Sequence, residues 1–266
     1  MVASAPAEGI RVSRGSEVNE RRLIVTWKND ASRGILPVAE LIIRGTEPHY
    51  RFGYLEGVRE ALRSGFQPFL AFPNLETTYE SEKIFPFFAN RVLPTTRPDY
   101  LESLTALGLT VLDTSVAEVL GRTNGRRATD RIETILVPTP DALGRYCTHF
   151  FLRGVSYSPG AEEIIAQLDP DERLVLVVDT SNDYNPRARS VQARSHQIGY
   201  VPDYLVDDLD ALERAGAVPN VFGVRANLPP QPAHYRLLCR IDCEWPRGFV
   251  PFRDARLVPY GGREAA

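Results

Sequence analysis

Short runs of β-branched and aromatic residues, separated by proline, glycine and asparagine, limit the folds that this sequence can adopt. Runs of this kind are typical of strands, and the residues between them mark turns. The sequence predicts strands at 23–27, 35–44, 50–55, 132–137, 146–153, 174–179, 191–194, 197–201, 221–226 and 235–243. The run LVLVVD at 174–179 predicts a buried strand, because nearly all of its residues are apolar.

Apolar residues with helical spacing occur in shorter segments between these runs. They predict helices at 56–65, at 100–109 after a cap at Asp99, at 115–123 after a cap at Thr114, and at 203–216. The segment 68–98 contains five prolines and five phenylalanines, which predicts a packed, irregular segment with short helical turns. The fold class expected is therefore α+β and rich in β-structure.

Composition shifts divide the chain into three parts. Residues 1–19 contain Ala, Ser, Gly and charged residues without periodicity, and we expect a disordered tail. The stretch VPTPDALG at 137–144 combines prolines, Asp and Gly before a new strand, which is typical of a domain boundary. The sequence therefore predicts two domains, at 20–140 and 141–266.

The charge balance argues against unspecific coating of DNA or of an anionic membrane. The chain has 31 basic and 34 acidic side chains and a net charge of −3, whereas such binding needs a surplus of cations. A local basic groove stays compatible with this balance. The first twenty residues lack the apolar core of a signal peptide, and no apolar run is long enough to span a bilayer. We expect a cytoplasmic protein that does not contact membranes.

No set of residues with the spacing of a metal or catalytic site is visible in the sequence. The three cysteines contain no CxxC pair, and the four histidines are scattered. Cys239 and Cys243 alternate with Leu237 and Ile241, which predicts a buried strand face rather than a metal site. The acidic residues at the start of the helix at 203–216 predict a solvated face; they are Asp203, Asp207, Asp208 and Asp210. We expect no cofactor, no metal and no enzymatic activity.

Three short sequence motifs in the second half, which we call words, resemble those of a known family. The word GVSYSPG at 154–160 follows a predicted strand and is preceded by Arg153, NDYNP at 182–186 follows LVLVVD, and IGYVP at 198–202 precedes a helix. Their order and spacing over about 148–245 resemble the HIRAN domain. That resemblance implies a small OB-like β-barrel with accessory helices in the second half.

The same resemblance implies a binding site for single-stranded DNA, in particular for 3′ ends. Tyr157 and Tyr184 are the candidates for base stacking, Asn182 and Asn185 form the polar turn, and Tyr200 occupies the end of a strand. The alternative interpretation is that these tyrosines are barrel residues with their hydroxyls at the surface, which is a common use of tyrosine. In that case they would not contact DNA.

This sequence departs from the family's pattern at several positions of the expected site. Ser156 and Ser158 replace a basic residue and a second aromatic residue, Asn185 replaces an aspartate, and Asp203 stands where a lysine would meet phosphate. The changes at Ser156, Ser158 and Asp203 remove a cation or a stacking face, or add a like charge to the phosphate backbone. A substitute basic stripe is expected beside the Asn182 turn, formed by Arg187, Arg189 and Arg194.

The first half is similar to the N-terminal subdomain of HipA-like kinases over about 22–125. The word FFANRVLP at 87–94 carries that similarity, and the kinase core of full-length members is absent. Phe85, Phe87 and Phe88 would contact a protein partner if they are exposed, and are core residues otherwise. The leading hypothesis is a non-enzymatic adaptor whose barrel binds nucleic acid. The alternative is a toxin–antitoxin or defence-type regulator that binds a separately encoded HipA-like kinase, with the barrel as a scaffold.

Overall fold

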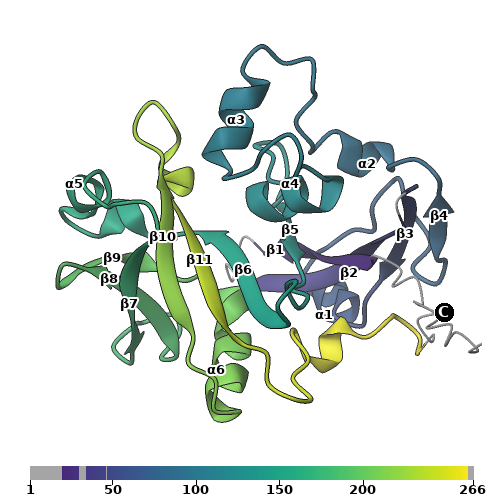
Figure 1. The fold of residues 1–266 in the computed structure, drawn as a ribbon. Coiled ribbons are helices and arrows are strands. Elements are labelled where there is room, and N and C mark those ends of the chain that lie inside the picture. Colours follow the sequence, from purple (N-terminus) through teal and green to yellow (C-terminus); the bar gives the residue numbers. More distant parts are fainter. Residues whose placement is uncertain (1–19, 30–33, 46, 263–266) are drawn as a thin grey trace, which may run out of the picture.

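The computed structural model describes residues 20–29, 34–45 and 47–262, and contains two antiparallel sheets (Figure 1). The predicted tail at 1–19 lies outside the described residues. One sheet has five strands in the order β4-β3-β2-β1-β5, and the other has six in the order β6-β11-β10-β7-β8-β9. This confirms the expectation of an α+β fold rich in β-structure. Among the described residues, no helix is long and apolar enough to cross a membrane.

The first sheet is formed by the strands predicted in the first half, together with one short additional strand. They are β1 (Glu20–Lys28), β2 (Ile35–Arg44), β3 (His49–Tyr54), β4 (Tyr79–Ser81) and β5 (Ile132–Leu136). β2 lies between β1 and β3 and is buried along most of its length, which explains why its sequence is apolar nearly throughout. The helices of this half are α1 (Val58–Arg63), α2 (Pro86–Ala89), α3 (Tyr100–Ala106) and α4 (Val116–Thr123).

The cap of α4 differs from the prediction by one residue. Ser115, rather than Thr114, accepts a hydrogen bond from the backbone N–H of Glu118 at 3.2 Å. This is the bond that a serine at the N-cap position makes.

The phenylalanine cluster packs against the core of the first half, with Phe88 buried and Phe85 and Phe87 half-buried. Phe88 is fully buried. Phe85 packs edge-on against Phe72 with ring centroids 5.1 Å apart, and Phe87 packs against Phe69 at 4.7 Å. Phe88 therefore has no surface to offer a protein partner, whereas a partner contact through Phe85 and Phe87 stays a prediction.

The second sheet contains the strands predicted beyond residue 144. They are β6 (Arg145–Phe151), β7 (Glu172–Asp179), β8 (Ala188–Ala193), β9 (His196–Tyr200), β10 (Asn220–Ala226) and β11 (Leu237–Glu244). The helices of this half are α5 (Ala161–Ile165) and α6 (Val206–Arg214), with 3₁₀ turns η1 (Val155–Tyr157), η2 (Asp203–Leu205), η3 (Ala233–Tyr235) and η4 (Ala255–Leu257). As predicted, Leu237, Cys239, Ile241 and Cys243 are buried on one face of β11.

The second sheet curls but does not form a closed barrel in the part of the chain that is described. Its two edge strands approach each other at one bridge, where Arg153 and Tyr200 exchange backbone hydrogen bonds of 2.9 and 2.8 Å. In this register Pro202 would face Phe151, and proline has no N–H to donate. The next pair beyond this bridge therefore lacks one of its two possible hydrogen bonds. The expectation of an OB-like barrel is corrected to a curled, open sheet, whose edges meet at a single bridge among the described residues.

The strand at 174–179 is exposed, and the prediction of a buried strand is wrong. In β7 only Leu174 is buried, whereas Val175 and Val178 are 57% and 47% exposed. β7 pairs with β10 only over its first three residues and with β8 over 175–179. Its second part is thus paired on one side only, with β8, which in turn pairs with β9, and water reaches both of its faces.

The two halves of the chain are packed together. Phe151 and Leu238 of the second sheet share a cluster with Leu104 and Val119 of α3 and α4. The C-terminal segment returns to the first sheet, beside α1 in Figure 1, where the N–H of Tyr260 donates to the carbonyl of Tyr54 at 2.9 Å. The division of the chain at 137–144 stays a prediction, and the structure shows that residues beyond 250 contact the first half.

Candidate nucleic-acid interface

The turn after β7 presents Tyr184 to solvent. The side-chain oxygen of Asn182 accepts hydrogen bonds from the backbone N–H groups of Tyr184 and Asn185 at 3.0 and 3.1 Å. The side-chain oxygen of Asn185 accepts in turn from the N–H of Arg187 at 2.9 Å. Such bonds are the reason that asparagine favours turns. Tyr184 is held between them with 85% of its surface exposed.

Tyr200 lies at the end of β9 and is fixed by its hydroxyl. This hydroxyl donates to a carboxylate oxygen of Asp179 at 2.8 Å. The hydroxyls of Ser181 and Tyr200 donate to Asp179 and hold the pKa of its carboxyl below the usual value. Gly154, with φ of 72°, lies beside the ring: a β-carbon there would be 3.3 Å from Cδ2 of Tyr200. The three predicted words therefore meet around Tyr200, through Gly154, the β7 turn and β9 itself.

A groove of about 550 Å³ opens beside these residues, between the two halves of the chain. We call it the Tyr184 groove. The second half contributes Arg153, Asn182, Tyr184, Asn185, Tyr200 and Asp203. The first half contributes Lys28, Arg126 and Glu133 across the contact between the two halves, which we call the seam. The groove thus contains exposed and half-buried aromatic rings, side-chain amides, three cations and two carboxylates.

The cations of this groove differ in how far they are neutralised. Arg126 is paired with Glu133 at 2.6 Å, and Arg153 is 3.4 Å from the same carboxylate. Arg153 also donates to the side-chain oxygen of Asn124 at 2.9 Å. Lys28 is exposed and forms no ion pair with any residue that the structure describes. Since one carboxylate serves two arginines, the groove keeps a small surplus of positive charge.

Sequence reasoning missed Lys28 and Arg126. Both lie in the first half, well before the HIRAN-like words, and nothing in their neighbourhood distinguishes them from other surface cations. Only the packing of the two halves brings them to the Tyr184 groove. Asp203, which the family resemblance placed at a phosphate contact, accepts a hydrogen bond from the side-chain amide of Asn185.

The predicted stripe of Arg187, Arg189 and Arg194 is largely neutralised by neighbouring groups. Arg187 is paired with Asp207 at 2.7 Å and Asp210 at 2.8 Å. Arg189 is buried and paired with Asp210 and Glu213. Arg194 is 3.9 Å from the carboxylate of Glu172 and also donates to the backbone and side chain of Gln167. These contacts do not support an open basic stripe. The prediction of a solvated acidic face at 203–210 is also corrected, because Asp208 is buried and Asp210 is paired with Arg187 and Arg189.

Tyr157 is separate from the residues that line the Tyr184 groove. It lies on η1 and is 91% exposed. The structure thus brings together Asn182, Tyr184, Asn185 and Tyr200, while Tyr157 and the three arginines lie outside the lining.

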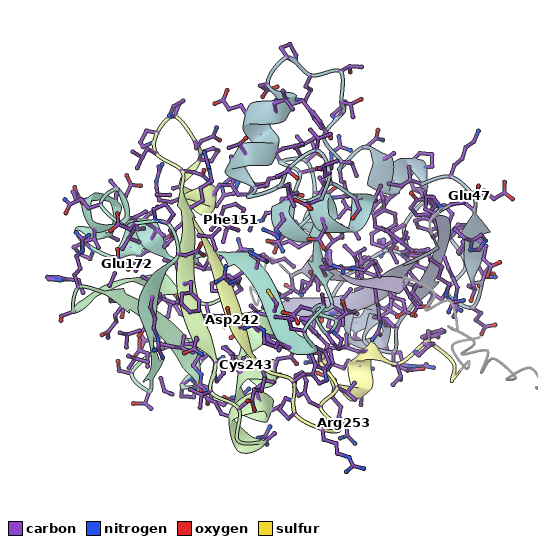
Figure 2. All side chains as sticks on the ribbon, in the orientation of Figure 1. Glu47, Phe151, Glu172, Asp242, Cys243 and Arg253 are labelled. Carbon is purple, nitrogen blue, oxygen red and sulfur yellow. The ribbon has the colours of Figure 1, made fainter. Side chains whose placement is uncertain are left out.

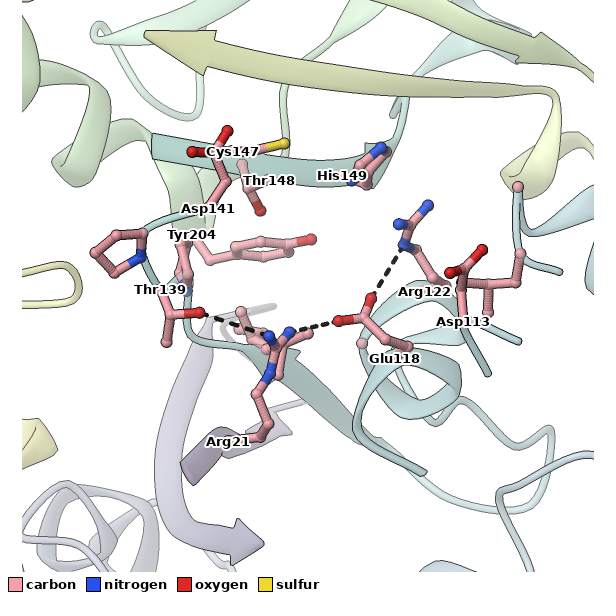
Figure 3. A pocket seen from close by; sticks show the side chains of 17 residues that line it. Arg21, Asp113, Glu118, Arg122, Thr139, Asp141, Cys147, Thr148, His149 and Tyr204 are labelled. Carbon is pink, nitrogen blue, oxygen red and sulfur yellow. Dashed lines mark hydrogen bonds and ion pairs between the residues drawn. The ribbon is translucent and has the colours of Figure 1, made fainter. Parts of the chain in front are cut away.

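A second cavity of about 480 Å³ lies on another side of the seam, and Figure 3 shows its side chains. Glu118 pairs with Arg21 and, at 3.7 Å, with Arg122. Burial, with Arg122 and Arg240 nearby, lowers the pKa of His149 to about 3, so its imidazole is neutral at physiological pH. Burial raises the pKa of the Cys147 thiol, which disfavours the reactive thiolate. Among the described residues, no group of three or more His, Cys, Asp or Glu side chains is placed to hold a metal ion.

Two solved structures are similar to part of this chain. One is a protein from Lactobacillus plantarum, with 17% identity and a TM-score of 0.30, covering 38% of this chain and 100% of that protein. The other is the HIRAN domain of human HLTF, with 16% identity and a TM-score of 0.29, covering 37% of this chain and 74% of that domain. No family model and no curated protein matches the sequence.

Proposed function

We propose that this chain is a non-enzymatic adaptor that binds single-stranded DNA in the Tyr184 groove. The observation that carries the proposal is the combination of an exposed aromatic ring on a hydrogen-bonded turn with three cations in one groove. Stacking on an aromatic side chain tolerates any base, and cations beside the ring attract the phosphate backbone. Both groups lie in the groove before any ligand arrives.

The carboxylate of Asp203 favours the end of a strand over its interior. A free 3′-hydroxyl donates a hydrogen bond to a carboxylate, whereas a phosphate at the same place is repelled by it. The amides of Asn182 and Asn185 supply further donors and acceptors for a terminal sugar. We therefore expect a strand with a free 3′-hydroxyl to bind more tightly than the same strand with a 3′-phosphate.

Fluorescence anisotropy of 5′-labelled oligothymidylate tests this proposal. We expect salt-sensitive binding of the strand with a free 3′-hydroxyl, and weaker binding of the 3′-phosphorylated strand, of blunt duplex and of RNA. Tyr184→Ala should weaken binding, and Tyr157→Ala is its matched control because that ring is similarly exposed but outside the groove. No salt-sensitive binding at micromolar protein refutes the proposal, and a loss with Tyr157→Ala alone refutes the choice of groove.

The scaffold alternative is supported by the ion pairs of Arg187 and Arg189, which remove two cations that a DNA-binding second half would expose. In this case the chain would be a regulator whose first half binds a protein such as a HipA-like kinase. The same titration separates the two functions, because a scaffold shows no affinity for any of the four nucleic acids.

A further inference from the structure

A cleft lined by three arginines runs along α6, from its first turn to its end, beyond the Tyr184 groove. Its volume is about 500 Å³, and we call it the arginine cleft. Arg214 comes from the end of α6, Arg247 from the turn after β11, and Arg253 from the segment before η4. Figure 2 labels Arg253, which projects from the lower edge of the molecule. Three separate segments therefore place cations around one cleft.

These three arginines differ from Arg187 and Arg189, because no carboxylate forms an ion pair with them in the part of the chain that the structure describes. Arg214 donates from Nε to the carbonyl of Asp210 at 3.0 Å, which leaves its charge uncompensated. No ion pair to a described residue involves Arg247 or Arg253, and all three side chains belong to exposed residues. Clustered guanidinium groups of this kind bind phosphate well, because each offers several N–H donors in one plane.

The acidic residues in the lining do not cancel this charge. Asp207 is paired with Arg187 at 2.7 Å. Asp208 is only 3% exposed, and burial raises the pKa of its carboxyl to about 7, so that its negative charge is partly lost at neutral pH. One oxygen of Asp208 accepts from the N–H of Phe252 at 2.7 Å, and the other is buried without a hydrogen-bond partner. The cleft therefore has a local surplus of cations in a chain whose net charge is −3.

A smaller pocket connects the arginine cleft with the Tyr184 groove. This pocket, of about 140 Å³, shares Asp203 and Tyr204 with the groove, and Asp207, Asp208 and Arg253 with the cleft. The three depressions follow η2 and α6, residues 203–214. At about 1.5 Å per helical residue, Arg214 in the cleft is roughly 17 Å along this path from Asp203, the groove residue at which the 3′ end is proposed to lie. With a rise of about 3.4 Å per stacked nucleotide, this path accommodates about five nucleotides.

We propose that the arginine cleft binds the phosphates of the same single strand whose end lies in the Tyr184 groove, about five nucleotides away from that end. The inference rests on the proposed function, and it assigns a second contact that the HIRAN-like words do not include. A strand shorter than this path occupies only the groove. A longer strand reaches both sites and gains the charge contacts of the cleft.

Oligothymidylates of three and twelve nucleotides with free 3′-hydroxyls test this inference on the full chain. The variant is Arg247→Gln with Arg253→Gln. The matched control is Lys83→Gln with Arg97→Gln, which removes two exposed cations from the segment between β4 and α3. For single strands each phosphate contact contributes about 0.7 to the slope of log K against log salt. We expect the variant to lose about 1.4 of that slope for the twelve-nucleotide strand, which is about 25-fold in affinity between 1 M and 0.1 M salt.

The trinucleotide separates this inference from the proposed function. Its affinity should be unchanged in the variant, and the control should bind both strands like the wild type. If the wild type binds the longer strand and the variant keeps the full salt slope, the cleft is not a phosphate contact and only the inference fails. An equal loss of affinity for the trinucleotide and the longer strand also overturns the inference, because a contact about five nucleotides from the end cannot affect a trinucleotide. If the wild type binds neither strand, the proposed function and the inference fail together.

Discussion

The substitution Asp208→Asn should stabilise the protein at and above neutral pH. Asp208 is 3% exposed, and one of its oxygens is buried without a partner. Burial raises the pKa of this carboxyl from 3.8 to about 7, and the nearby Asp207 adds to the effect, against the hydrogen bond from Phe252. Asparagine keeps an oxygen that accepts this hydrogen bond and carries no charge, so the variant removes the cost of burying the carboxylate.

The sign and magnitude of the effect follow from the two pKa values. A carboxyl whose pKa is higher in the folded than in the unfolded state favours folding at low pH, and this advantage is lost as pH rises from the unfolded to the folded value. The window is therefore about pH 4 to 7. Each pKa unit corresponds to about 1.36 kcal/mol, so the full difference is on the order of 4 kcal/mol. Relative to the Asp208→Asn variant, the free energy of unfolding of the wild type should fall by roughly 3 kcal/mol between pH 5 and pH 8.

Urea unfolding monitored by tryptophan fluorescence at pH 5, 6, 7 and 8 measures this difference. The control is Asp207→Asn, because Asp207 is an exposed neighbour on the same helix, paired with Arg187. Its free energy of unfolding relative to the wild type should vary little with pH. The reasoning is wrong if the difference between Asp208→Asn and the wild type stays constant from pH 5 to pH 8, or grows toward acid.

Three further substitutions test the site and the core. Tyr184→Ala should weaken binding of single strands by roughly 1 to 3 kcal/mol in anisotropy titrations, with an unchanged melting temperature because the ring is 85% exposed; a clear loss of stability would mean that the ring packs on the fold. Phe88→Ala should lower the free energy of unfolding by about 3 to 5 kcal/mol in urea, since a fully buried ring leaves a cavity. Gly154→Ala should cost about 1 kcal/mol or more, because φ is 72° and the new methyl group crowds Tyr200; a calorimetric melt that shows no loss would contradict this turn geometry.

Local sequence patterns predicted most elements of this fold, because strand residues and turn residues differ within a few positions. The strand at 35–44 agrees with β2 at both ends. The prediction failed for β7, whose composition matches a buried strand. Whether LVLVVD is buried depends on how far β10 extends beside it, and β10 pairs with only the first three residues of β7. The end of a neighbouring strand, more than forty residues later, is not encoded in the run itself.

In the candidate site, local sequence likewise does not show which charged side chains pair with one another. The sequence shows a basic stripe at 187–194 and an acidic helix start at 203–210 as two separate features. In the structure α6 lies against β8, and Arg189 meets Asp210 and Glu213 across that contact. A prediction of free cations would need the packing of the helix, whereas the asparagine turn at 182–185 was predictable because its hydrogen bonds span only two or three residues.

Because Arg187 and Arg189 are paired with acidic residues, the cations of the Tyr184 groove come largely from the other half of the chain. The second half supplies the aromatic rings and amides, but the acidic residues of α6 pair with the arginines of its own half. Lys28 and Arg126 come from the first half. The bond from Arg153 to Asn124 at 2.9 Å helps to hold the two halves together. The amide of Asn227 strengthens the same seam by donating to the carbonyl of Ala106 at 2.9 Å. Because phosphate contacts would need the cations of one half and base stacking the rings of the other, the proposed function requires that the two halves stay packed.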